Sequence, residues 1–120
     1  MRLSRDTLRA LALLGALTPS ACTGPLGPPL DAFHDGRLPE SAAHFRRLEP
    51  RLSDLSAPER ARYALYRGLS HLGLGDARAA HQWLSIAKRL ERDDPSCFDA
   101  VERGELYAAW RSMGRAPGED

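Results

Sequence analysis

The amino-acid sequence predicts an all-α protein, and three observations lead to that fold class. Apolar residues recur every three or four positions, which is the spacing of one face of a helix. Strand signals are absent, since Val101 is the only valine and Ile86 the only isoleucine. Prolines, glycines and short polar residues stand where such helices would begin and end.

The first two expected helices are short. A half-helix is expected at 30–35, followed by Gly36. Pro39 then opens a helix over 39–49, because a proline in the first turn gives up no intrahelical hydrogen bond. The apolar residues of this second helix lie on one stripe, formed by Ala42, Phe45 and Leu48.

Two longer helices follow, at 58–73 and 77–91. Ser56 and Glu59 have the spacing of a capping box, in which each side chain bonds to the backbone amide of the other residue. Asp76 is placed to cap the helix that begins at Ala77. The apolar stripes are Leu65, Leu69 and Leu72 in the first helix, and Ala80, Leu84, Ala87 and Leu90 in the second.

A last helix is expected at 97–113, with a tail at 114–120. Ser96 and Asp99 repeat the capping pattern, and Gly114 is placed to end the helix. The sequence also repeats itself: the pattern from Ala64 to Gly68 returns at Ala100 to Gly104. A period in the middle thirties with two helices per period predicts a short helical-hairpin solenoid.

The best repeat unit, 61–94, resembles a tetratricopeptide repeat. Its first helix and turn carry Gly68, Gly75 and Asp76, and its second helix has small residues at Ala80 and Ala87. The resemblance extends weakly over 30–113 and implies a domain of about four to five helices. It also implies that Ala80 and Ala87 lie at the tightest contact between the two helices, with Arg78 on the outer face.

Two residues of the repeat depart from the family pattern. Arg67 and Arg103 stand where tetratricopeptide repeats usually place a large apolar residue.

The resemblance implies protein binding as the activity, through a concave surface. In this register the partner-binding residues are Arg62, Leu65, Leu69 and Leu72. Either a partner or another helix of this chain covers the leucines, because exposed leucines forgo burial free energy.

The N-terminus has the pattern of an export signal. Arg2, Arg5 and Arg9 precede a short apolar run at 11–17, and small residues follow. The run is too short to span a membrane. The ending Ser20-Ala21-Cys22 resembles a bacterial lipoprotein signal, which implies removal of 1–21 and lipidation, including palmitate, at Cys22.

A Pro/Gly-rich segment at 22–29 then predicts a tether between the anchor and the domain. Thr23 is not Asp, and by the retention rule of some bacteria this favours the outer membrane, with the domain facing the periplasm. An ordinary secretory signal is the alternative. In that case the protein is periplasmic or secreted, and Cys22 and Cys97 could form a disulfide.

Charge and motifs exclude several function classes. The chain has 17 basic and 16 acidic residues, and removal of Arg2, Arg5, Arg9 and Asp6 with the leader would leave a nearly neutral mature chain. It lacks the basic patch that nucleic acids require. His34, His44, His71 and His81 show no metal-ligand spacing, and no nucleophile motif is present.

We therefore expect no enzyme activity, no cofactor, no metal and no small-molecule substrate. The expected function is a non-enzymatic adaptor or scaffold lipoprotein of the bacterial cell envelope, which binds an envelope protein partner. The alternatives are a non-lipidated accessory protein with the Cys22–Cys97 disulfide, and a structural module that completes a larger solenoid in another chain.

Overall fold

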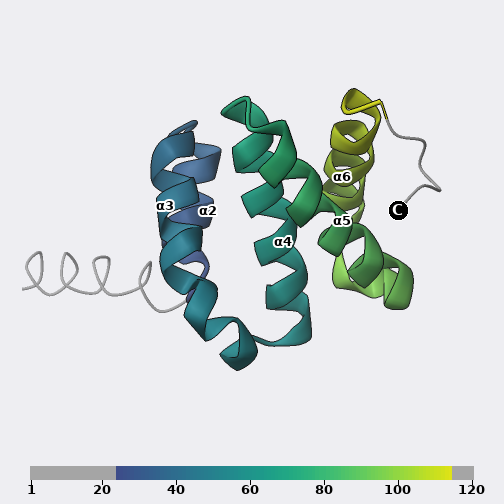
Figure 1. Cartoon of the computed structure of the whole chain (residues 1–120). Helices are drawn as coiled ribbons and strands as arrows, with labels where there is room; N and C mark the ends of the chain where they lie inside the picture. Colours follow the sequence, from purple (N-terminus) through teal and green to yellow (C-terminus); the bar gives the residue numbers. More distant parts are fainter. Residues whose placement is uncertain (1–23, 115–120) are drawn as a thin grey trace, which may run out of the picture.

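A computed structural model describes residues 24–114, and these residues fold into helices joined by short turns (Figure 1). No strand occurs among them, so the expected all-α class is confirmed for this part of the chain. Cys22 and the leader lie outside the described residues. The elements are α2 Gly27–His34, α3 Leu38–Leu48, the 3₁₀ helix η1 Glu49–Asp54, α4 Ala57–Gly73, α5 Ala77–Asp93, the 3₁₀ helix η2 Pro95–Cys97 and α6 Ala100–Ser112.

The structure corrects the predicted start of the domain. Helix α2 begins at Gly27, so residues 27–29 belong to the folded domain and not to a tether. A proline is tolerated in the first turn of a helix, where no intrahelical bond is lost. Leu26 and Pro29 are buried, and the Pro29 carbonyl accepts a hydrogen bond from the Ser41 hydroxyl at 2.9 Å.

Most of the predicted helix starts are confirmed. Ser56 and Glu59 form the expected capping box of α4, and the Asp76 side chain accepts a hydrogen bond from the Ala79 amide in α5. Proline occupies the first turn of α3. These signals are local, since each cap satisfies amides within three residues of itself.

The start of the last helix was predicted incorrectly. The Asp94 side chain accepts from the Ser96 amide and organises η2, after which Phe98 is extended. Helix α6 therefore starts at Ala100, and its capping box pairs Asp99 with Glu102. The sequence contains two overlapping cap patterns here, and the 3₁₀ turn takes up the residues of the first.

The α4–α5 hairpin is the most closely packed part of the fold. Its turn passes through Gly75, which has φ +79°, a conformation that favours glycine. Ala80 and Ala87 are fully buried, as expected for small residues on the inner face of α5. The two helices also approach closely at Gly68, where an added Cβ would lie 2.6 Å from Leu84 Cγ.

Aromatic side chains connect the two hairpins. The Phe45, Tyr63 and Trp83 rings form successive edge-to-face pairs at 5.2 and 5.4 Å between centroids. The Tyr63 hydroxyl donates to the Phe45 carbonyl at 2.6 Å, which ties α4 to α3. Buried aromatic pairs of this geometry add about 0.5–1.5 kcal/mol beyond their area of burial.

Helix α6 lies at the far side of the α4–α5 hairpin from α2 and α3 (Figure 1). Its Leu106 and Trp110 side chains are fully buried in the common core. The C-terminal end of α4, the start of α5 and the end of α6 come together at one end of the fold. The described chain enters at the opposite end of α4, where Gly24 lies beside Glu59.

Candidate functional site

The four predicted partner-binding residues occupy different environments. Leu65 is fully buried, which places it in the core instead of on a binding surface. Leu69 is half-buried against the same core. The exposed Arg62 forms an ion pair with the buried Glu102 of α6, with 3.1 Å between Nε and Oε2. Leu72, at the end of α4, lines a pocket.

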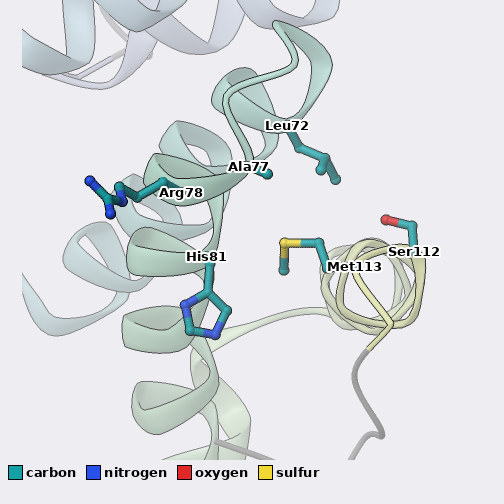
Figure 2. A pocket seen from close by; sticks show the side chains of 6 residues that line it. All are labelled: Leu72, Ala77, Arg78, His81, Ser112 and Met113. Atoms are coloured by element: carbon teal, nitrogen blue, oxygen red, sulfur yellow. The ribbon is translucent and has the colours of Figure 1, made fainter.

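This pocket has a volume of about 510 Å³ and opens between the α4–α5 turn and the end of α6. Its size falls within the range of about 300–1,000 Å³ that is typical of ligand pockets. Figure 2 shows Met113 extending from α6 toward the side of α5, with Ala77 and Leu72 at the turn. The lining residues are Leu72, Ala77, Arg78, His81, Ser112 and Met113.

Local backbone structure places these side chains. The α4–α5 turn closes with hydrogen bonds from the Leu74 amide to the Ser70 carbonyl and from the Asp76 amide to the His71 carbonyl. The first backbone bond within α5 runs from the Ala80 amide to the Asp76 carbonyl. Helix α5 starts at Ala77, and Ala77 and Arg78 both line the pocket, so the start of this helix lies at the pocket.

The end of α6 supplies the other wall. The Met113 amide bonds to the last carbonyls of α6, and Gly114 follows with φ +77°. The glycine ends the helix where the sequence predicted, because it adopts the left-handed conformation at low cost. Met113 is thus held at the end of α6, half-buried against the core, and faces the pocket.

The pocket lining is mixed, with apolar side chains at Leu72, Ala77 and Met113 and polar side chains at Arg78, His81 and Ser112. Arg78 is exposed at its rim and no carboxylate of the described residues pairs with it; its guanidinium extends away from α6 (Figure 2). No carboxylate lines the pocket, and the first turn of α5 has no acidic residue. The Ser112 hydroxyl donates to the Ala109 carbonyl at 2.7 Å.

His81 lies between the pocket and the core. Its ring stacks on Trp110 of α6, with centroids 5.6 Å apart and planes at 18°. Its Nε2 is enclosed and has no hydrogen-bond partner. A buried nitrogen without a hydrogen-bond partner costs free energy. The Nε2 atom of His81 is therefore an unsatisfied polar atom next to the pocket.

A second group of polar residues lies where α4 meets α6. Burial raises the pKa of the Tyr66 phenol, and the nearby Glu105, Glu102 and Asp99 carboxylates raise it further. Burial also raises the pKa of Glu105, whose Oε2 has no hydrogen-bond partner. Glu102 is already held by Arg62 and by the capping box, so these acidic groups act mainly in structure.

The remaining candidate residues show no chemical site. Cys97 is a free, buried thiol, and burial raises its pKa, which opposes formation of the reactive thiolate. Within residues 24–114 no group of three or more histidine, cysteine or acidic residues could hold a metal ion. No helix in the described part of the chain is both long and apolar enough to cross a membrane.

Sequence reasoning assigned Leu72 to a site but missed the other five residues that line the pocket. Arg78 was expected on the outer face of its helix, and Ala77, His81, Ser112 and Met113 were assigned to no site. Helical periodicity identifies the apolar face of each helix, but it does not show that the end of α6 stands apart from the α4–α5 turn. That gap depends on how the helices pack, which no local signal encodes.

Comparisons with known proteins give no relative from which the site could be interpreted. The chain matches no protein-family model, no curated protein and no solved structure.

Proposed function

We propose that this protein is a non-enzymatic adaptor of the bacterial envelope that binds a partner protein through the pocket at the α4–α5 turn. The pocket carries the proposal, because it brings apolar side chains from the ends of α4, α5 and α6 together at the surface of a small helical domain. Such sites bury an anchoring side chain of a partner. Leu72, one of the predicted partner-binding residues, lines this pocket, whereas Leu65 is buried in the core.

A short tetratricopeptide-like arrangement is part of the proposal. Two helical hairpins, α2–α3 and α4–α5, are followed by α6, and the glycine at 68 allows α4 and α5 to pack closely. The repeated sequence pattern of period about 36 supports the same arrangement. Repeat proteins of this type commonly use their surfaces for protein binding.

Anchoring through a lipid on Cys22 is the second part. The leader pattern and the Ser20-Ala21-Cys22 ending support it. The described chain enters beside Glu59 at one end of α4, and the pocket lies at the other end. An anchor at Cys22 would therefore leave the pocket open to an envelope partner.

Photocrosslinking in cells tests the adaptor function. A photoreactive amino acid at position 112 should give a discrete protein adduct in the envelope fraction, whereas the same group at the exposed position 82 of α5 should not. Ala77→Trp should remove the adduct at 112, because it fills the mouth of the pocket from an exposed position. Circular dichroism of the variant should match the wild type.

The control at position 82 separates specific binding from proximity. Equal adducts from positions 82 and 112, or an adduct at 112 that survives Ala77→Trp in a folded protein, would show that the pocket is not the binding site.

One observation favours a second candidate function, completion of a larger solenoid in another chain. Helix α6 has no hairpin partner among the described residues, and its Val101 side chain is 70% exposed. A module of this kind would bind along α6 and not at the pocket. Val101→Glu would then abolish association while Ala77→Trp would not, which is the reverse of the result expected for the adaptor.

A further inference from the structure

We draw no further inference here: the strongest candidate, the exposed apolar face of α6 that Val101, Gly104 and Ala108 form, carries nothing because nothing in the structure shows what covers it.

Discussion

Arg67 shows how a charged residue can serve the core of a helical domain. It is only 7% exposed, and its guanidinium lies 4.4 Å from the centroid of the Trp83 ring. It donates to the Tyr63 hydroxyl at 2.7 Å and to Glu49 Oε1 at 3.0 Å. The arginine therefore fills the volume of an apolar residue with its stem and joins α4 to η1 and α5 with its head.

Arg67→Ala should lower the free energy of unfolding by about 2–3 kcal/mol, because it removes the packed stem, the contact with Trp83 and the hydrogen bonds to Tyr63 and Glu49. Arg89→Ala on the exposed face of α5 should change it by less than about 0.5 kcal/mol. Urea denaturation followed by circular dichroism measures both. Equal effects would mean that Arg67 is not part of the core.

His71 should make stability depend on pH. Burial lowers the pKa of its imidazole below the usual 6.5, and Arg67 and Arg46 lower it further, although Asp76 opposes them. As the pH falls below about 6.5 the unfolded chain takes up a proton that the folded chain still resists. The folded state is therefore destabilised on acidification.

His71→Gln should remove this part of the pH dependence, so that its urea midpoint falls less between pH 8 and pH 5 than that of the wild type. His44→Gln, a change at a half-buried histidine of α3, should leave the dependence in place. An unchanged pH profile in His71→Gln would contradict the assignment.

At the scale of elements, two glycines inside helices should respond in opposite ways to the same change. A Cβ at Gly68 of α4 would lie 2.6 Å from Leu84 Cγ and 3.1 Å from the Leu84 amide nitrogen. Gly104 of α6 is exposed and has no atom within 4 Å of the added carbon.

Gly68→Ala should therefore destabilise the protein by about 1–3 kcal/mol through overpacking, in spite of the better helix propensity of alanine. Gly104→Ala should stabilise it by about 0.5–1 kcal/mol. The midpoints of thermal unfolding of the two variants, compared with that of the wild type, test both expectations. A stabilised Gly68→Ala variant would show that α4 and α5 can separate at little cost.

The bounds of the helices show which features of the fold the sequence predicts. The bounds of α4 and α5 were predicted closely, because the Ser56–Glu59 box, Asp76 and Gly75 act within a few residues. The start of α6 was not, because the Asp94 carboxylate accepts hydrogen bonds from the amide and the hydroxyl of Ser96, and Asp99 instead of Ser96 caps the helix. The pocket was predicted only at Leu72, since its other wall comes from a helix about 40 residues further along the chain.

At the scale of the whole molecule, the start of the described chain at Gly24 and the pocket lie at opposite ends of α4. If Cys22 is the lipid attachment point and the first residue after the cut, as proposed, Cys22→Ala should lose membrane fractionation and accumulate as the uncleaved precursor. Fractionation and mass spectrometry of the mature chain measure this. A processed and soluble Cys22→Ala protein identical to wild type would contradict lipid anchoring.

Burial of Leu26 sets the height at which such an anchored protein works. Leu26 is fixed in the core only four residues after Cys22, and four residues span at most about 14 Å. The 17 residues of α4 add about 25 Å. A lipid on Cys22 would thus hold the pocket within about 40 Å of the bilayer surface. Any partner of such an anchored protein would have to bring its binding segment into that thin layer, and would therefore meet the protein next to the membrane and not across the depth of the compartment.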